Sequence, residues 1–209
     1  VVAPLVDAHL LRHQGHAGRG PHTHVLAVQE LVDRDRRGVA LRDHVMPTGV
    51  RPTVFMMCSA MKPATPEQRH HGVACVTARD FRWERGDIKS ISLLGNVLMK
   101  QYATDHDAFE TVMLRDGFLT EGSSANVMVI KDGSMLAPRQ SHQILPGSTC
   151  DTSYLLAKEH GLTLELRPVS EAELRNADEL WLSSSGREVL PITARATLRP
   201  RAASSAVGA

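Results

Sequence analysis

Lys89 is a candidate amine nucleophile, in the segment DIKSISLLGN. A strand-like segment precedes it. The residues Leu93, Leu94, Val97, Leu98 and Gln101 lie three and four apart, which predicts a helix with one apolar stripe that begins near Ser90 or Ser92. A nucleophilic amine needs an ordered backbone and polar neighbours. Most lysines are solvated surface charges, so this position alone leaves both interpretations open.

Glu121 lies near the start of the segment TEGSSANV, a loop rich in hydrogen-bonding groups between two predicted strands. A pyridine-type cofactor needs an acidic partner at its ring nitrogen, because the protonated ring withdraws electrons from a carbanion. Glu121 could supply this carboxylate. The alternative is a simple hairpin connection.

Two segments could bind a phosphate group. Gly147, Ser148 and Thr149 place small side chains and backbone N–H groups at the start of a predicted helix, where the helix dipole favours an anion. The run SSSG at 183–186 adds hydroxyl and amide donors at the end of a predicted strand. Alone, the first segment is a plausible helix cap and the second an ordinary loop.

The elements that must position these residues alternate along the chain. We expect strands near 50–57, 72–77, 108–114, 118–121, 127–130, 134–136, 162–166 and 179–183, and helices from about 90, over 148–160 and over 170–178. Tight turns are predicted at 115–117 and 131–133, and a polar linker at 62–69. This order predicts a mixed α and β domain that begins at 78–86.

The composition favours a globular protein with a small-molecule partner. The 209 residues are 42% hydrophobic, and 24 basic against 23 acidic residues leave a net charge of +1. This balance provides no basic stripe for nucleic acid and no polybasic run for a membrane. Cys58, Cys75 and Cys150 are too few and too widely spaced for a disulfide framework or a CxxC metal site. We therefore expect a soluble, cytoplasmic protein.

Both ends of the sequence differ from the rest. The first thirty residues contain His9, His13, His16, His22 and His24, which could be read as metal ligands. Without neighbouring Cys or acidic residues at ligand spacing, a Gly-rich, poorly ordered terminus is the better interpretation, and no metal site is predicted. The tail after Thr193 is of similarly low complexity.

Four segments, DIKSISLLGNVLMKQYA, TEGSSANV, ILPGST and ELWLSSSGREVLP, resemble class IV aminotransferases in this order, and D-amino-acid aminotransferases most of all. The resemblance covers about residues 37–192. It implies an α+β fold, with the large cofactor-binding domain of a fold type IV aminotransferase after an incomplete small α/β domain. The predicted limits are 1–36 for an atypical segment, 37–80 for the small-domain part and linker, 81–193 for the large domain and 194–209 for the tail.

The resemblance implies pyridoxal 5′-phosphate as cofactor and gives Lys89 a covalent role. In the family the lysine of the DIKS motif forms a Schiff base with the cofactor and then moves a proton at the substrate α-carbon. Glu121 corresponds to the ring-nitrogen partner, and Leu145 to the residue packed against the ring.

The same resemblance implies four phosphate-site residues. Ser148 and Thr149 correspond to the pair that contacts the phosphate, although relatives can carry an apolar residue at the position of Ser148. Ser184 and Ser185 correspond to further polar contacts nearby.

Upstream, RGVALRDH resembles the segment from which D-amino-acid enzymes take an arginine and a histidine to bind the substrate α-carboxylate. These are Arg42 and His44. A guanidinium can hold a carboxylate with two parallel hydrogen bonds, which orients the substrate. A surface turn with solvated charges is the alternative.

We therefore expect a homodimeric transaminase that moves an amino group between a D-amino acid, such as D-alanine, and a 2-oxo acid, such as 2-oxoglutarate. Branched-chain transamination and aminodeoxychorismate lyase activity are alternatives, and Arg42 and His44 argue against both. A third interpretation is a truncated, non-catalytic remnant, because the phosphate-anchoring arginine and the substrate-site aromatic residue of the family are not found. Both ends are expected to be replaced or truncated.

Overall fold

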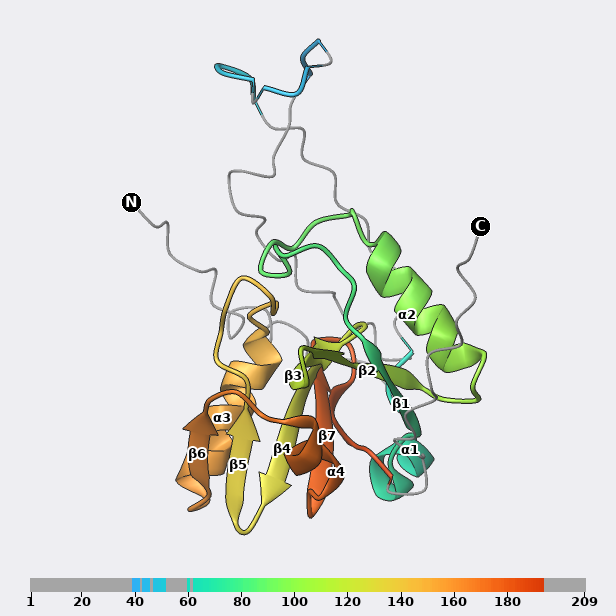
Figure 1. Cartoon of the computed structure of the whole chain (residues 1–209), viewed down its shortest axis with the longest axis vertical. Coiled ribbons are helices and arrows are strands. Elements are labelled where there is room, and N and C mark those ends of the chain that lie inside the picture. Colours follow the sequence, from blue (N-terminus) through green and yellow to red (C-terminus); the bar gives the residue numbers. More distant parts are fainter. Residues whose placement is uncertain (1–38, 42, 46, 52–59, 61, 194–209) are drawn as a thin grey trace, which may run out of the picture. The chain divides into compact units, whose positions relative to one another are not determined.

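The computed structural model describes residues 39–41, 43–45, 47–51, 60 and 62–193, and Figure 1 shows their secondary structure. Contacts between Cα atoms divide the chain into two units, and the second contains described residues 63–193. The predicted poorly ordered segment 1–36, most of the predicted strand 50–57 and the tail 194–209 lie outside the described residues. The domain limits predicted from the sequence remain predictions.

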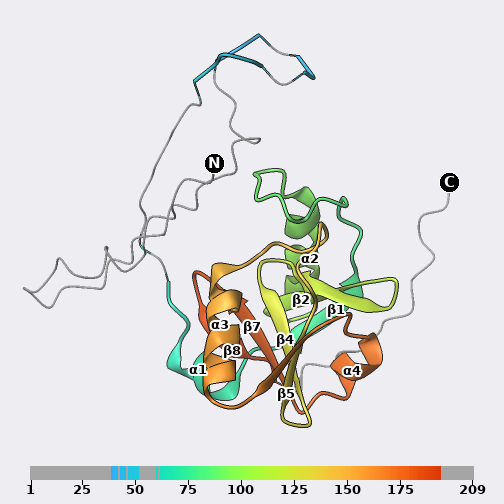
Figure 2. The same ribbon diagram turned by 90° about the vertical axis from the view of Figure 1, so that its left-hand side faces the viewer.

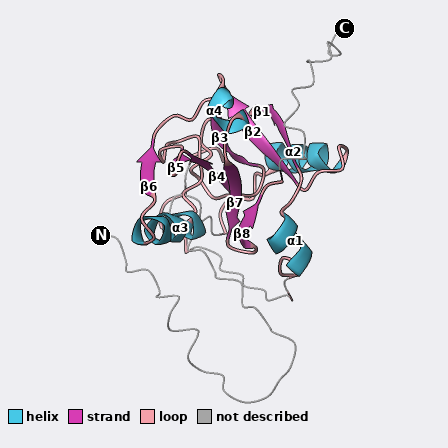
Figure 3. Cartoon of the chain, turned by 90° about the horizontal axis from the view of Figure 1, so that it is seen from below, coloured by secondary structure: helices cyan, strands magenta, loops and turns pink. Residues whose placement is uncertain are grey.

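The second unit contains all the helices and strands of the described residues. The helices are α1 (Pro66–His71), α2 (Leu94–Thr104), α3 (Ser148–Glu159) and α4 (Glu171–Arg175), and the strands are β1 (Cys75–Arg79), β2 (Glu110–Arg115), β3 (Phe118–Gly122), β4 (Asn126–Lys131), β5 (Ser134–Ala137), β6 (Thr163–Leu166), β7 (Glu179–Ser184) and β8 (Glu188–Pro191). The helices and strands, shown in Figure 3, are thus interspersed along the chain, with β2 to β5 following one another without a helix between them.

Two Asp-Gly turns close hairpins in the middle of the chain. Asp116 and Gly117 have φ angles of 52° and 80°, and Asp132 and Gly133 have φ angles of 48° and 74°. Positive φ at both central residues is the conformation that matches the twist of two-residue hairpins. The predicted hairpins β2–β3 and β4–β5 are confirmed.

Two elements of the structure, α1 and β8, are absent from the prediction. The segment predicted to be a polar linker contains α1, which begins after a capping box in which Thr65 and Gln68 bond each other's backbone N–H groups. Pro66 is compatible with the helix because its first turn needs no donor from that position. Strand β8 was not predicted, since its four residues are short and include a proline.

The strands form two sheets. In the smaller, β1 pairs parallel with β2, and β2 pairs antiparallel with β3. The larger has the order β6-β5-β4-β7-β8, in which only the β5–β6 pair is parallel. Helix α2 contacts β1 and β2, and α3 contacts β6, β7 and β8 (Figures 1 and 2).

Alternation along the strands builds two apolar clusters. In β4, Val127 and Val129 join one cluster, while Met128 and Ile130 join the other, because successive side chains point to opposite faces. The first cluster lies between the sheets and includes Cys75, Val112, Leu114, Leu119, Leu136, Val169, Leu174, Leu180, Leu182 and Leu190. The second joins the larger sheet to α3 and includes Met135, Cys150 and Ala157. Burial on both faces of the larger sheet thus fixes the register of its strands.

Helix α2 buries a different face from the one its apolar stripe indicates. Met99 and Ala103 are buried, whereas Leu94, Val97 and Leu98 of the predicted stripe remain exposed. The Thr111 hydroxyl donates a hydrogen bond to the Met99 carbonyl oxygen at 2.6 Å, which ties α2 to β2.

Among the described residues, no helix has the length and apolar character that a membrane crossing requires.

The glycine after α1, Gly72, allows a test of how closely the end of this helix packs against β8. Gly72 has φ 74° and ψ −172°, a region essentially restricted to glycine, and an added Cβ would lie 2.7 Å from the Pro191 carbonyl oxygen. Gly72→Ala should lower the free energy of unfolding by about 1–3 kcal/mol in urea denaturation.

Gly117→Ala is the matched control, since Gly117 also has positive φ but an added Cβ there meets nothing within 4 Å. If the free energy of unfolding decreased equally in the two variants, the close approach of Gly72 to β8 would contribute nothing to the effect.

Candidate active site

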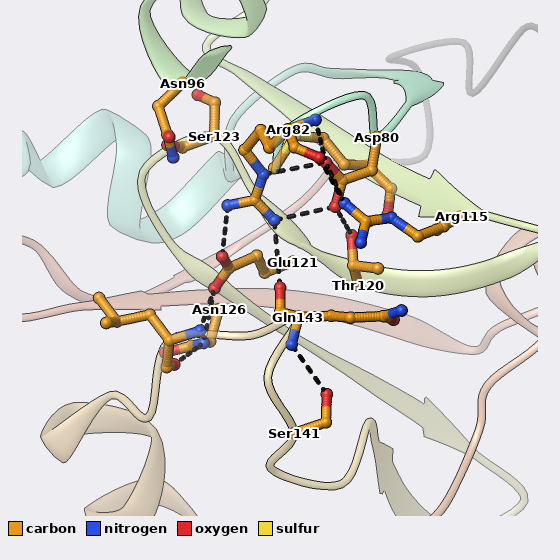
Figure 4. Close-up of polar contacts among 12 residues, drawn as sticks. Asp80, Arg82, Asn96, Arg115, Thr120, Glu121, Ser123, Asn126, Ser141 and Gln143 are labelled. Carbon is orange, nitrogen blue, oxygen red and sulfur yellow. Dashed lines mark hydrogen bonds and ion pairs between the residues drawn. The ribbon is translucent and has the colours of Figure 1, made fainter. Parts of the chain in front are cut away.

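The carboxylate of Glu121 lies buried at the end of β3, where three other segments donate hydrogen bonds to it. Arg82 Nη1 lies 2.6 Å from Glu121 Oε1. The Leu145 backbone N–H and the Asn126 side-chain amide donate to Oε2 at 3.1 and 3.4 Å. Because a carboxylate can accept about four hydrogen bonds, one further donor can still be accommodated. Figure 4 shows these contacts.

Arg82 lies between two carboxylates (Figure 4). Its Nε and Nη2 donate to the two oxygens of Asp80 at 3.0 and 2.9 Å, while Nη1 donates to Glu121. The Asp80 carboxylate also accepts from the Thr120 hydroxyl at 2.9 Å and lies 3.2 Å from Arg115 Nη2. All of these groups have little or no contact with solvent, so each buried charge needs its partners to compensate for the water it has lost.

Burial and ion pairing act in opposite directions on these groups. Burial raises the pKa of Glu121 above its ordinary value, although Arg82 and the Leu145 N–H counteract this. Burial would likewise raise the pKa of Asp80, but the bonds from Arg82 and Thr120 lower it. Burial opposes the charge on Arg82, yet its two carboxylate partners raise its pKa. The pKa of Glu121 therefore depends on how the Arg82 guanidinium divides its hydrogen bonds between Glu121 and Asp80.

Asn126 connects Glu121 to the start of α3. Its side-chain amide also donates to the Leu145 carbonyl oxygen at 2.9 Å. Gly147, the N-cap of α3, approaches so closely that an added Cβ would lie 2.1 Å from Asn126 Oδ1. Only glycine fits here without displacing the asparagine. Leu145 and the α3 N-terminus thus lie beside the buried carboxylate.

The first turn of α3 contains the predicted phosphate-contacting pair. No side chain caps this helix, and its first backbone N–H groups have no partner within the helix. Ser148 is exposed and Thr149 is half-buried. Backbone donors and two hydroxyls at the positive end of a 12-residue helix suit a phosphate group.

Ser184 and Ser185 come from the end of β7. The neighbouring Ser183 is the register partner of Asn126, so this strand end lies beside the Asn126–Gly147 contact. Ser184 is half-buried and lines a pocket of about 130 Å³, whereas Ser185 is exposed.

Lys89 lies in the loop before α2, with an exposed side chain. The loop runs along the segment that leads to Leu145: the Asp87 N–H donates to the His142 carbonyl oxygen at 3.2 Å, and Gly86 packs against the Gln143 carbonyl. Among the described residues, no hydrogen bond or ion pair involves the Lys89 amine. The predicted helix start near Ser90 or Ser92 is corrected to Leu94, because the residues from Ser90 to Ser92 are not helical and Leu93 is the N-cap.

The predicted carboxylate-binding pair belongs to the first unit of the chain. His44 is exposed, and its backbone N–H bonds the Asp43 side chain. Arg42 lies outside the described residues. The role of this pair at the site therefore stays a prediction.

Sequence reasoning did not identify three residues that organise the site: Arg82, Asn126 and Glu110. Glu110 is 1% exposed and accepts hydrogen bonds from the Ser123 backbone at 3.1 Å and the Ser124 hydroxyl at 2.6 Å, which fixes the loop after Glu121. An acidic residue at the start of the apolar run ETVMLR was the available signal. Because the partners of Arg82 are 2 and 39 positions away, local pattern alone could not pair it with Glu121.

The chemistry of these donors fits pyridoxal phosphate. The site offers a buried acid with capacity for a ring N–H, an adjacent apolar side chain, a helix N-terminus with hydroxyls, and an amine in a neighbouring loop. Among the described residues, no group of His, Cys, Asp and Glu side chains could hold a metal ion.

Comparison with known proteins relates this arrangement to one family. The sequence model of "Amino-transferase class IV" matches residues 24–194. D-alanine aminotransferase from Bacillus licheniformis is 41% identical over 157 residues, which are 75% of this chain and 55% of that protein. The chain therefore spans about half the length of the curated relatives it matches.

Solved structures agree with this match. A fold IV transaminase from Curtobacterium pusillum is 30% identical with a TM-score of 0.56, covering 60% of this chain and 47% of that one. The branched-chain amino acid aminotransferase from Thermobaculum terrenum, in its PLP form, is 26% identical with a TM-score of 0.55, covering 57% and 41%. The predicted α+β, fold type IV class is confirmed, and the chain belongs to the class IV aminotransferases.

Proposed function

We propose that this chain carries out pyridoxal-phosphate-dependent transamination between a D-amino acid, such as D-alanine, and a 2-oxo acid, such as 2-oxoglutarate. Lys89 is the proposed covalent attachment residue. The observation that carries the proposal is the buried Glu121 carboxylate, which Leu145 and Asn126 join to the uncapped start of α3. The identity of 41% to a D-alanine aminotransferase supports the choice of substrate class.

When bound, the cofactor supplies an aldehyde and an electron-withdrawing ring. Glu121 would hold the proton at the ring nitrogen, and Leu145 would pack against the ring. Ser148 and Thr149, with the α3 N–H groups, would bind the phosphate, and Ser184 and Ser185 would add donors. These roles match the residue types: an acid for the ring nitrogen, an apolar side chain for the ring, and hydroxyl and N–H donors for the phosphate.

Lys89 would have a second role once its amine is free. A neutral amine could remove the proton from the substrate α-carbon and deliver it to carbon C4′ of the cofactor. The exposure of Lys89 in the loop beside residues 142–145 is compatible with this movement. Arg42 and His44 would hold the α-carboxylate and so determine which face of the substrate meets the base.

Replacing the attachment residue tests the proposal. The purified full chain with excess pyridoxal phosphate should show a visible absorption band of the protein-bound cofactor, and Lys89→Ala should lose it because no other amine replaces this one. Lys158→Ala, at an exposed position in the last turn of α3, is the matched control and should keep the band. A colourless wild-type protein would contradict the proposal.

The substrate class is tested by three parallel assays. With 2-oxoglutarate as acceptor, D-alanine should be turned over faster than L-leucine, and aminodeoxychorismate should not yield pyruvate. Arg42→Ala should raise the KM for D-alanine by at least about tenfold, since a bond to a charged group contributes about 1.5–3 kcal/mol. Turnover of L-leucine or aminodeoxychorismate alone would support one of the other two activities instead.

We also propose that the chain forms a homodimer, the assembly that the family resemblance implies. The exposed side chains of Leu94, Val97 and Leu98 on α2 provide apolar surface that association could bury. Light scattering coupled to gel filtration should give twice the mass of one chain, and the mass of a single chain at high protein concentration would contradict this.

A further inference from the structure

The three-residue network Asp80–Arg82–Glu121 suggests a role for a residue outside the proposed cofactor contacts. Arg82 donates to both carboxylates at once, with Nη1 on Glu121 and with Nε and Nη2 on Asp80. Its side chain is 6% exposed, and those of its partners are 0% and 7% exposed. One guanidinium is therefore shared between two buried acids.

We propose that Arg82 is a positioning residue that keeps the Glu121 carboxylate ionised and oriented, with Asp80 as the competing anion that sets how much of the guanidinium charge Glu121 receives. The inference rests on the proposed function, because its consequence for the reaction requires Glu121 to meet the cofactor ring nitrogen.

The geometry gives Arg82 this role. Its contact with Glu121 uses Oε1, whereas the Leu145 N–H and the Asn126 amide bond Oε2. The carboxylate is thus held on both oxygens by donors from three segments, which fixes its plane. The backbone N–H of Leu145 and the Asn126 amide are neutral, so Arg82 supplies the only cationic contact to Glu121 among the described residues.

The charges of the network explain why the competition matters. Asp80 and Glu121 are acidic, Arg82 and Arg115 are basic, and Arg115 contacts Asp80 at 3.2 Å rather than Glu121. Asp80 thus draws on two cations while Glu121 has one. Burial favours the neutral form of Glu121, and the negative charge of Asp80 acts in the same direction.

The position of one proton links this network to catalysis. A carboxylate held in its charged form leaves the shared proton on the ring nitrogen, where it makes the ring a better electron acceptor. A carboxyl group that becomes neutral keeps that proton itself. The step would balance without any other reactant, because the same proton would reside either on the ring nitrogen or on the Glu121 carboxyl group.

Two charge-removing variants, of which Asp80→Asn also keeps the shape of the side chain, should shift the pKa of Glu121 in opposite directions. Arg82→Gln removes the cationic donor and should raise the pKa of Glu121. Asp80→Asn removes the competing anion, leaves Arg82 in place, and should lower it. A role limited to packing would instead predict destabilisation by both variants without this opposition, because each removes one partner of a buried ion pair.

The titration is measured on the full chain without cofactor, by the side-chain carboxyl ¹³C shift of Glu121 in protein labelled at glutamate. The signal is assigned by its loss in Glu121→Gln. Opposite shifts of the midpoint in R82Q and D80N support the proposal, whereas an unchanged midpoint or shifts in the same direction overturn it. If R82Q does not fold, D80N alone decides, since an unchanged or raised midpoint in that variant has the same consequence.

The consequence for catalysis is measured with pyridoxal phosphate labelled with ¹⁵N in its ring. The ring-nitrogen shift should indicate protonation in wild type and D80N and loss of protonation in R82Q, with kcat of R82Q reduced at least about tenfold and KM little changed. Arg82→Lys should restore part of the signal, because it restores the charge without the second contact.

These measurements distinguish failure of the proposed function from failure of the proposed role of Arg82. A wild-type chain that binds no pyridoxal phosphate overturns the proposed function, whatever the Glu121 titration shows. Cofactor binding with a ring-nitrogen signal that is identical in wild type and R82Q overturns only the role of Arg82.

Discussion

The buried contact between Arg82 and Glu121 is the interaction on which the candidate site depends. An ionised carboxylate inside a protein is unfavourable unless charge and hydrogen bonds replace the lost water. Arg82 provides the charge, while Leu145 and Asn126 provide the bonds. The same three donors come from the segment after β1, strand β4 and the loop before α3. The contacts that form the site therefore also connect these segments of the unit.

The two-sheet architecture explains why these segments meet. β3 ends at Gly122 and β4 begins at Asn126, so the chain passes from the smaller to the larger sheet directly after Glu121. The short connection is fixed by Glu110, which binds the backbone and hydroxyl groups of the loop. A residue at this crossing can contact both the segment after β1 and the start of α3. The position of Glu121 is thus a consequence of topology.

The sequence predicted the local features of this unit well and its long-range contacts poorly. The Asp-Gly turns, α3 and most strands follow from residue types within a few positions, and the structure contains them. Helix α2 shows the limit: its apolar stripe is visible in the sequence, yet Met99 and Ala103 pack inward because β2 provides their partners. Arg82 could not be assigned either, since its role depends on a carboxylate 39 residues away.

The central claim is that a cofactor aldehyde becomes bonded to the amine at position 89, and chemical trapping tests it most directly. The full chain is incubated with pyridoxal phosphate, reduced with borohydride and digested with trypsin, and the peptides are analysed by mass spectrometry. The account predicts one modified peptide, 86–100, uncleaved after Lys89 and heavier by the mass of the reduced cofactor. Modification at other lysines with residue 89 unmodified, or no stable modification at all, would contradict it.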